Sequence, residues 1–294
     1  MSVRSKISDK GISVVLGTYN RKKFLLQTIE SIRNELKIFE EKFEIIVIDG
    51  GSDDGTIQWL AQQKDIITII QHNHGSIKGE QVSRRSWGYF MNLGFKVAQG
   101  KYICMLSDDC LVVPGAIING YNYFEQLLSE DEKIGSLAFY WRNFPEMKNY
   151  WVGLTLGNKM FVNHGMFLKT ALIEVDFIDE DNYNFYHADG DLCLKLWDKD
   201  YKCVDSKLSF IEHFSHAGLK TRKSNLDGQK SDFENYKKKW EGKFYNSAVN
   251  NEGSWLKLDF DDEYKTADKF KDVSFFKYII IKYFFPKARK IIKN

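Results

Sequence analysis

Several features that are typical of other protein classes are scarce in this sequence. Its 294 residues include only three prolines and four cysteines, and no two cysteines form a Cys-x-x-Cys pair. The cysteine pattern argues against a zinc site and fits a reducing compartment. With 43% hydrophobic and 15% aromatic residues, the chain is expected to fold, which excludes an intrinsically disordered protein. Its length indicates one large domain, or one domain with an appendage.

Long hydrophobic runs are absent as well. No stretch approaches the ~20 apolar residues that a membrane-spanning helix needs. Residues 1–6 contain no apolar segment like that of a secretory signal. We therefore expect a cytoplasmic protein, with peripheral attachment to the inner face of the plasma membrane as the alternative. The net charge of +2 excludes nothing by itself, and no feature indicates a nucleic-acid partner.

Strand and helix patterns alternate through the first half of the chain. Short apolar runs predict strands, and apolar residues at helical spacing predict helices. The predicted strands are 12–16, 44–48, 66–71 and 102–106, the predicted helices are 21–36, 56–61, 87–98 and 115–128, and a loop is predicted at 72–83. Such alternation predicts an α/β fold with a mostly parallel sheet.

The second half of the chain is less regular. Its patterns predict strands at 134–141, 159–163, 202–205 and 209–211, and a helix that includes 192–197. From about residue 224 onward the chain is rich in Lys, Asn and aromatic residues. No internal repeat or low-complexity tract is visible.

Two adjacent acidic residues, Asp108 and Asp109, follow the predicted strand at 102–106. Open α/β sheets bind their ligands at such strand ends. Adjacent carboxylates repel each other and lose hydration there unless a cation joins them, and hard oxygen ligands suit Mg²⁺ or Mn²⁺. The pair therefore predicts a divalent metal site, and the alternative is an Asp-rich turn that caps the next segment.

Polar segments also follow the first two predicted strands. Thr18, Tyr19 and Asn20 follow the first, and a Gly-containing segment, 49–56, follows the second. Glycines let a backbone approach a ligand, and Asp49 can accept hydrogen bonds from a base or a ribose. Each segment alone is compatible with an ordinary turn and helix cap. Three such strand ends side by side indicate that the sheet binds a ligand at this edge.

Four segments of the chain resemble the motifs of family 2 glycosyltransferases. Residues 12–21 resemble V-S-[VI]-[IV]-[IVL]-x-T-Y-N-R, residues 49–56 resemble D-[DG]-G-S-x-D-G-T, residues 92–103 resemble N-x-G-x-x-x-A-x-G-x-Y-[IL], and 107–109 stand at the D-x-D position. The four motifs occur in the family's order. The resemblance covers roughly residues 10–218 and weakens after the first half.

The resemblance implies a GT-A fold. A domain at 1–223 would then combine a Rossmann-like nucleotide-sugar-binding half (10–130) with an acceptor half (131–223), followed by a helical C-terminal extension (224–294). It also implies an inverting transfer of a sugar from a nucleotide-diphosphate donor, above all a UDP-sugar. The acceptor would be a glycan or a lipid-linked saccharide in surface polysaccharide synthesis.

The resemblance also implies roles for individual residues. The nucleotide-sugar-binding positions fall on Thr18, Tyr19, Asn20, Asp49, Ser52, Asn92 and Asp108, and the metal position falls on Asp109. Family members often carry a histidine after a late strand, which adds His213 as a metal ligand, with His216 as the alternative. Among the other histidines, His164 lies nearest the expected acceptor wall.

A catalytic base is expected in the second half. An inverting transfer needs a carboxylate that takes the proton of the acceptor hydroxyl. Residues 177–195 resemble the family's F-D-E … E-D-x-D-L-x-x-R segment, in which Asp189 matches the acid after the Glu and Asp191 is the alternative base. Asp189 as a helix N-cap and Asp191 as a first-turn acid remain the structural alternatives.

Several positions depart from the family pattern. An acid is replaced at Ser107, Gly50 and Ala188, and an Arg is replaced at Met91 and Lys195. Arg84 or Arg85 is a candidate for the missing cation beside a phosphate. The departures motivate an alternative function, a non-catalytic nucleotide-sugar-binding or scaffold protein of the same fold. A sugar-phosphate nucleotidyltransferase is disfavoured because its Gly-rich N-terminal loop with Arg and Lys is not evident.

The end of the chain is basic and aromatic. Residues 264–294 contain nine Lys or Arg against two Asp, and 275–285 are almost entirely apolar or aromatic. Such a segment suits an anionic membrane surface, where a lipid-linked acceptor would be delivered. We expect this contact through residues 273–293. The alternative is a helix that packs on the domain or on a second subunit, so a homo-oligomer remains compatible with the sequence.

Overall fold

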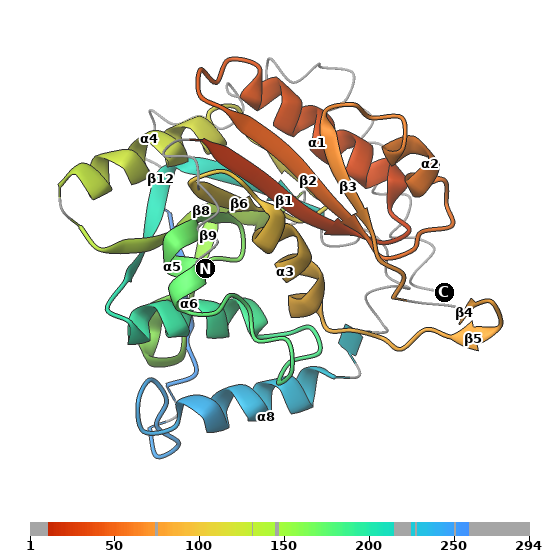
Figure 1. The fold of residues 1–294 in the computed structure, drawn as a ribbon. Helices are drawn as coiled ribbons and strands as arrows, with labels where there is room; N and C mark the ends of the chain where they lie inside the picture. Colours follow the sequence, from red (N-terminus) through yellow and green to blue (C-terminus); the bar gives the residue numbers. More distant parts are fainter. Residues whose placement is uncertain are drawn as a thin grey trace, which may run out of the picture.

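A large mixed β-sheet forms the centre of the molecule (Figure 1). The computed structural model describes residues 11–73, 76–130, 132–144, 147–214, 225–226, 228–249 and 251–258. Within them the main path of the sheet runs β10-β9-β8-β11-β6-β1-β2-β3, with β7, β12 and β13 attached beside it. The predicted α/β class is therefore confirmed.

The first half of the chain builds the parallel part of the sheet. Its strands are β1 (Ile12–Thr18), β2 (Phe43–Asp49), β3 (Ile66–Ile70) and β6 (Tyr102–Met105), and its helices are α1 (Lys22–Leu36), α2 (Thr56–Leu60), α3 (Trp87–Val97) and α4 (Ala116–Ser129). All eight were predicted within a few residues. Parallel pairing sets Thr18 opposite Asp49 and Val15 opposite Met105, so three strands end at one edge of the sheet.

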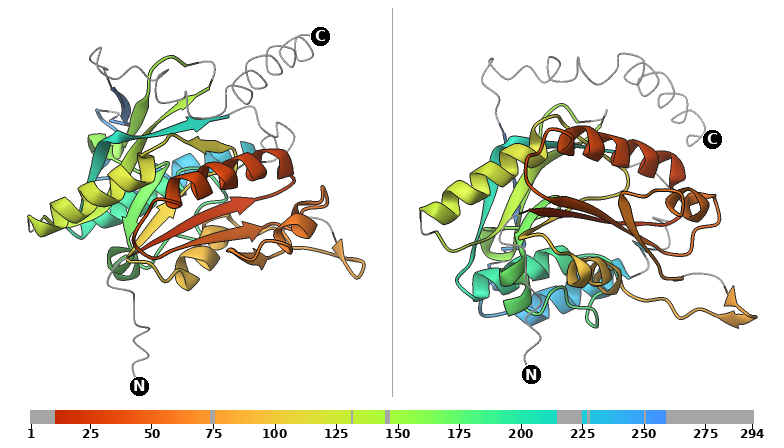
Figure 2. Two further views of the ribbon diagram at one scale, coloured as in Figure 1. Left: turned by 90° about the horizontal axis from the view of Figure 1, so that it is seen from above. Right: turned by 45° about the horizontal axis from the view of Figure 1, so that its top comes forward.

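Hydrophobic side chains cover both faces of these strands, as a parallel sheet requires. One face, with Val14 and Leu16 of β1, packs against α1, α2 and α4. The other face, with Val15, packs against α3, α5 (Lys169–Glu174), α6 (Ala188–Asp198) and α8 (Gln229–Trp240). Figures 1 and 2 show these two groups of helices on opposite sides of the sheet.

The second half extends the sheet mostly with antiparallel pairs. Its elements are β7 (Cys110–Val112), β8 (Ile134–Asn143), β9 (Trp151–Thr155), η1 (Leu156–Asn158), β10 (Lys159–Met160), β11 (Gly165–Leu168), β12 (Lys202–His213) and β13 (Ser254–Lys257). β11 runs antiparallel to both β6 and β8 and so joins the two halves. β12 lies parallel to β8 and antiparallel to β7.

Several predictions for the second half are wrong in detail. The two strands predicted at 202–205 and 209–211 are one strand, β12, whose pairing with β8 shifts between Ser206 and Phe210. The strand predicted at 159–163 ends at Met160. β7, β9, β11 and β13 were not predicted, because strands of three to five residues carry little periodicity. The loop predicted at 72–83 contains a small hairpin, β4 (Ser76–Ile77) and β5 (Glu80–Gln81).

The described part of the C-terminal extension packs on the domain. α8 joins the core beneath α6, and β13 pairs antiparallel with β9. Among the residues that the structure describes, no helix has the length and apolar character needed to cross a membrane. His216 and the expected membrane contact at 273–293 lie outside the described residues.

Candidate functional site

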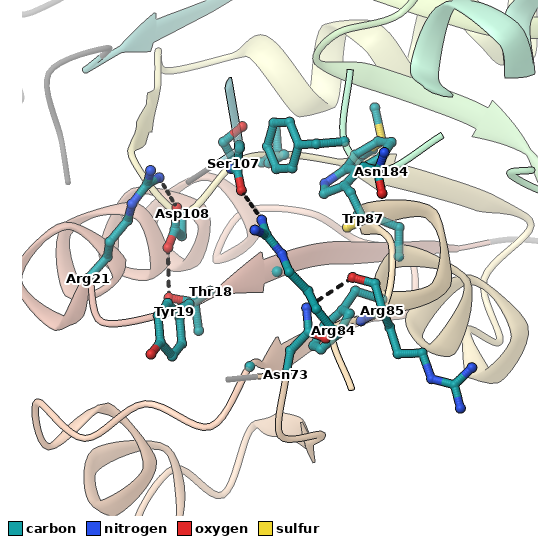
Figure 3. Close-up of a pocket in the computed structure, with 18 of the residues that line it drawn as sticks. Thr18, Tyr19, Arg21, Asn73, Arg84, Arg85, Trp87, Ser107, Asp108 and Asn184 are labelled. Carbon is teal, nitrogen blue, oxygen red and sulfur yellow. Dashed lines mark hydrogen bonds and ion pairs between the residues drawn. The ribbon is translucent and has the colours of Figure 1, made fainter. Parts of the chain in front are cut away.

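A pocket opens where β1, β2 and β6 end (Figure 3). Thr18, Tyr19 and Asp108 line it, as predicted from their positions after these strands. Arg84 and Arg85 line it as well, and Arg84 donates a hydrogen bond to Asn225, another lining residue. Helix α3 adds Trp87, Phe90 and Met91, which give this side of the pocket an apolar surface.

Arg21 bridges the two adjacent carboxylates. Its Nη1 donates hydrogen bonds of 2.9 Å to Asp108 Oδ1 and of 2.9 Å to Asp109 Oδ2. The hydroxyl of Thr18 donates to Asp108 Oδ2 at 2.7 Å. The sequence predicted a divalent metal ion at these carboxylates, and that ion stays a prediction; within the described residues the guanidinium of Arg21 contacts both carboxylates. Arg21 ends the first motif, but its partners lie 87 and 88 residues away, which no local pattern indicates.

The two carboxyl groups differ in their proton affinity. Burial raises the pKa of Asp108 to about 6, although Arg21 and Thr18 favour its ionised form. Burial also opposes ionisation of Asp109, but the contacts with His213 and Arg21 outweigh it and lower the pKa of Asp109. Asp109 is therefore the carboxylate that stays charged over the wider pH range.

Strand pairing brings His213 to Asp109. β7 and β12 pair with His213 opposite Cys110, and the backbone N–H of Phe214 donates to the carbonyl of Asp109 at 2.8 Å. His213 Nε2 then lies 3.4 Å from Asp109 Oδ1. The Nδ1 of the same ring lies 2.9 Å from Asn143 Oδ1, so Nδ1 carries a proton and donates it there.

This pair of atoms fits a divalent cation. Asp109 Oδ1 is buried and accepts no conventional hydrogen bond from the described residues. A protonated His213 would direct its Nε2 proton at that oxygen, whereas a neutral His213 with its proton on Nδ1 directs the Nε2 lone pair at it, so a proton or a metal ion has to lie between the two atoms. No three His, Cys, Asp or Glu side chains in the described ranges converge on one metal position. Protein ligation would thus rest on two residues, with the other ligands supplied by a bound molecule or water.

His164 lies beneath this pair. It is 1% exposed, and its Nε2 is 3.2 Å from Ser107 Oγ and 3.1 Å from Cys110 Sγ. Its ring centre lies 5.5 Å from that of His213. Burial lowers the pKa of His164 to about 3, so its imidazole is neutral at physiological pH. His164 therefore supports the site as an uncharged packing group.

Only one of the two carboxyl oxygens of Asp49 accepts hydrogen bonds from the described residues. Oδ1 accepts hydrogen bonds from the N–H groups of Gly51 and Ser52 at 2.8 and 2.7 Å. Oδ2 is buried and has no hydrogen-bond partner among the described residues. A buried carboxylate oxygen without a partner is costly, and a ligand N–H or O–H would satisfy it.

Two other predicted binding residues brace the turns that form the pocket. Ser52 Oγ accepts from the N–H of Asn20 at 2.8 Å, and Asn20 Oδ1 accepts from the N–H of Asp53 at 2.8 Å. Asn20 has a φ of 52°, a backbone conformation that Asn adopts more readily than most residues. The two side chains thus connect the turn after β1 to the turn after β2, and their contact with a ligand stays a prediction.

Asn92 lies away from the lined pocket and is 2% exposed. Its Nδ2 donates to Ile178 O at 2.9 Å and to Glu180 Oε1 at 2.7 Å, and its Oδ1 accepts from the N–H of Ile178 at 3.1 Å. These three bonds fix the segment before α6 to α3. Binding of a nucleotide sugar by Asn92 therefore stays a prediction, and its observed contacts are structural.

The two candidate bases occupy different environments. Asp189 is partly buried at the start of α6, and Asn163, a pocket residue, donates to its Oδ2 at 3.2 Å. Burial raises the pKa of Asp189. Asp191 is fully buried and accepts hydrogen bonds from Lys239 Nζ and Trp240 Nε1, each at 2.8 Å. Asp189 thus lies behind the lining residue Asn163, and its role as a base stays a prediction, whereas Asp191 ties α6 to α8.

Comparison with known proteins identifies relatives of this chain. The family model described as "Glycosyl transferase family 2" matches residues 13–168, just over half of the sequence. The WfaP protein of Escherichia coli, named a UDP-Glc:alpha-D-GlcNAc-diphosphoundecaprenol beta-1,3-glucosyltransferase, is 26% identical over 70% of this chain and 78% of its own length. A glycosyltransferase of Rickettsia bellii is 35% identical, but the match spans only 36% of this chain and 14% of that protein.

Solved structures share the fold. The mannosyltransferase PcManGT of Pyrobaculum calidifontis, in complex with GDP-Man and Mn²⁺, superposes with a TM-score of 0.55 at 17% identity and covers 79% of this chain and 65% of its own. TarS of S. aureus in complex with UDP superposes with a TM-score of 0.52 at 14% identity, and the match covers 69% of this chain and 60% of the TarS chain. These likenesses confirm the predicted GT-A fold.

Proposed function

The chain belongs to glycosyl transferase family 2, and from this premise we propose that it transfers a sugar from a nucleotide-diphosphate donor with inversion. The donor is a UDP-sugar in this proposal, which accords with the names of WfaP and of the TarS complexes. The observation that carries the proposal is the cluster of Arg21, Asp108, Asp109 and His213 beside the pocket. Its two carboxylates outnumber its one guanidinium, so the cluster can bind a divalent cation, which would stabilise a diphosphate leaving group.

In this proposal the donor lies along the ends of the parallel strands. The unpartnered Oδ2 of Asp49 would accept a hydrogen bond from the base, and Thr18, which lines the pocket with Tyr19, lies opposite Asp49 in the strand pairing. Arg84 and Arg85 bring positive charge to the pocket for the phosphates, in place of the Arg that the family often has at Met91. Guanidinium groups suit this task because they pair with phosphate oxygens through two parallel hydrogen bonds.

Asp109 and His213 would hold the divalent cation, Mg²⁺ or Mn²⁺. Their facing atoms, 3.4 Å apart, and the unpartnered Oδ1 of Asp109 support this assignment. When bound, the ion would neutralise the charge of the departing nucleotide diphosphate. Asn143 orients the imidazole of His213 through Nδ1 and so keeps Nε2 directed at Asp109.

Asp189 would act as the general base. Asn163 joins its carboxylate to the pocket, and its raised pKa brings it closer to the operating pH, where a base transfers protons best. In the proposed step, Asp189 takes the proton of the acceptor hydroxyl as that oxygen attacks the anomeric carbon. The bond from this carbon to the diphosphate breaks on the opposite side, which inverts the configuration.

The acceptor proposed is a glycan or lipid-linked saccharide of a surface polysaccharide. WfaP, by its name, acts on a diphosphoundecaprenol-linked sugar, and another relative, GgaB of Bacillus subtilis, is named a minor teichoic acid biosynthesis protein. Peripheral attachment to an anionic membrane through 273–293 belongs to the same proposal. The alternative, a non-catalytic nucleotide-sugar-binding protein, is favoured by one observation, that Arg21 already pairs with both carboxylates.

One experiment separates these functions. Purified protein is incubated with UDP-Glc, UDP-GlcNAc or GDP-Man, with Mn²⁺ or with EDTA, and release of the nucleoside diphosphate is measured with a saccharide acceptor and with water as the only acceptor. We expect release that requires Mn²⁺ in the wild type and falls by at least 100-fold in Asp109→Asn, because an amide is a poor metal ligand. Asp65→Asn, an exposed carboxylate paired with Arg33, is the matched control and should behave as the wild type. Equal Mn²⁺ dependence in Asp109→Asn would refute the metal assignment, and binding without any turnover would favour the alternative.

A further inference from the structure

A loop that precedes α6 closes the pocket on the side away from the aspartates. Its residues Asn184 and Phe185 line the pocket together with Trp87. Figure 3 shows Asn184 and Trp87 on the side opposite Thr18 and Asp108. This loop lies beyond the residues that match the family model, 13–168. No motif in the sequence assigns a role to it.

A buried carboxylate of α8 holds this loop. Asp232 is fully buried, and its Oδ1 accepts from the backbone N–H of Asn184 at 2.9 Å and from Asn184 Nδ2 at 3.1 Å. Its Oδ2 accepts from the N–H groups of Phe185 and Tyr186 at 2.9 and 3.0 Å. A buried carboxylate is stable only with such compensation, so Asp232 and the loop fix each other.

This contact determines how the amide of Asn184 is turned. Only the NH₂ group can face the carboxylate of Asp232, because the carbonyl oxygen would meet like charge. The Nδ2 also lies on the α8 side, 3.0 Å from the position that a Cβ on Gly228 would occupy. The backbone carbonyl of Asn184 is used as well, since it accepts from the N–H of Trp87 at 2.8 Å. The side-chain oxygen accepts no hydrogen bond from any residue that the structure describes.

We propose that the side-chain oxygen of Asn184, positioned by Asp232, accepts a hydrogen bond from a hydroxyl of the donor's sugar. The inference rests on the proposed function, in which the nucleotide lies against the opposite side of the pocket. An exposed amide oxygen beside the indole of Trp87 offers the combination of a fixed polar group and an aromatic surface that suits a sugar. Asn184 would thus help to select the donor, and Asp232 is a positioning residue.

The proposal also assigns part of the C-terminal extension to the binding site. Asn225 lines the pocket, and its Oδ1 accepts a hydrogen bond from Arg84. Asp232 follows in the first turn of α8, where the positive end of the helix favours a carboxylate. Asn225 therefore contributes to the pocket directly, and α8 contributes through Asp232, which holds Asn184.

The test compares the affinities of a nucleotide and its sugar conjugate. Isothermal titration calorimetry with Mn²⁺ measures Kd for UDP, UDP-Glc, UDP-GlcNAc, GDP and GDP-Man with the wild type, Asn184→Ala, Asp232→Asn and Asn235→Ala. Asn235 is the matched control, because it lies on the same helix and donates to Asn182 O at 2.9 Å, outside the pocket. Asn184 is exposed, so Asn184→Ala is expected to fold even if Asp232→Asn does not.

The expected result is a loss of affinity for the nucleotide sugar but not for the free nucleotide. Asn184→Ala should weaken binding of the nucleotide sugar by about 3- to 10-fold, as for one lost hydrogen bond, and leave binding of the free nucleotide unchanged. Folded Asp232→Asn should show the same pattern, and Asn235→Ala should show neither change. An unchanged affinity ratio in Asn184→Ala, or equal weakening of nucleotide and nucleotide sugar, overturns the inference. Failure of the wild type to bind any of the five ligands would instead refute the proposed function, and the inference with it.

Discussion

Replacement of Arg21 by Met should destabilise the protein through the two aspartates that it leaves behind. The side chains of Arg21, Asp108 and Asp109 are only 17%, 5% and 6% exposed. Met keeps most of the volume and removes the charge, so two adjacent buried carboxylates lose the group that neutralises them. Removal of one partner from a buried ion pair costs about 3–5 kcal/mol. Against a total stability of about 5–15 kcal/mol, this loss is large but compatible with a folded protein.

A surface pair provides the matched control for this substitution. Arg33 also contacts a carboxylate with two hydrogen bonds, to Asp65 at 2.7 and 2.6 Å, but these side chains are 35% and 52% exposed. Arg33→Met should therefore cost no more than about 1 kcal/mol. Urea denaturation at pH 7 with EDTA, followed by circular dichroism, measures both losses.

Divalent cations should reverse part of the loss in Arg21→Met. Without the guanidinium, both carboxylates can bind Mn²⁺ without competition from Arg21, so the ion should bind more tightly; a bound ion stabilises the folded state by about 2.7 kcal/mol when its concentration is 100 times Kd. Mn²⁺ should consequently raise the stability of Arg21→Met more than that of Arg33→Met. A loss in Arg21→Met no greater than that in Arg33→Met would refute the argument that Arg21 stabilises the pair, and equal responses to Mn²⁺ would refute the argument that Arg21 competes with a cation there.

Two further predictions separate chemistry from structure in α6. Asp189→Asn should lower kcat by about 10²–10⁴-fold with little change in stability, as for a lost general base. Because burial raises the pKa of Asp189, the wild-type kcat should fall as the pH drops through a value above that of an ordinary Asp, and activity that persists below pH 4 would contradict this role. Asp191→Asn should instead destabilise the protein by about 3–5 kcal/mol, because it weakens the buried contact with Lys239 and Trp240. Full stability of Asp191→Asn in urea denaturation would contradict that assignment.

The first half of the fold could be predicted because its signals are local. Strands such as β1 and β2 are buried on both faces, so they appear as continuous apolar runs, and the helices between them show helical spacing. The positions of Thr18, Asp49 and Asp108 at strand ends follow directly from that pattern. Parallel neighbours then bring these ends together without any further information.

The second half of the fold and several contacts of the site could not be predicted, because they depend on segments that are distant in the sequence. β7 and β11 have three and four residues, too few for a periodic signal, yet β7 places Asp109 next to His213. The partners of Asp232 lie 46 to 48 residues away and are mostly backbone N–H groups, which any sequence provides. The role of Asp232 therefore becomes visible only in three dimensions.

The irregular pairing within β12 has a consequence for how the site can vary. From Cys203 to Ser206 this strand pairs with β8 in one register, and from Phe210 onward it pairs in another, with three residues between that pair with nothing on β8. A bulge of this kind separates the alignment of a strand's two ends. Residues can be gained or lost at the bulge while the final stretch, which carries His213, keeps its place opposite Cys110. The number of residues between the start of β12 and its final stretch can therefore vary without moving His213, which faces Asp109.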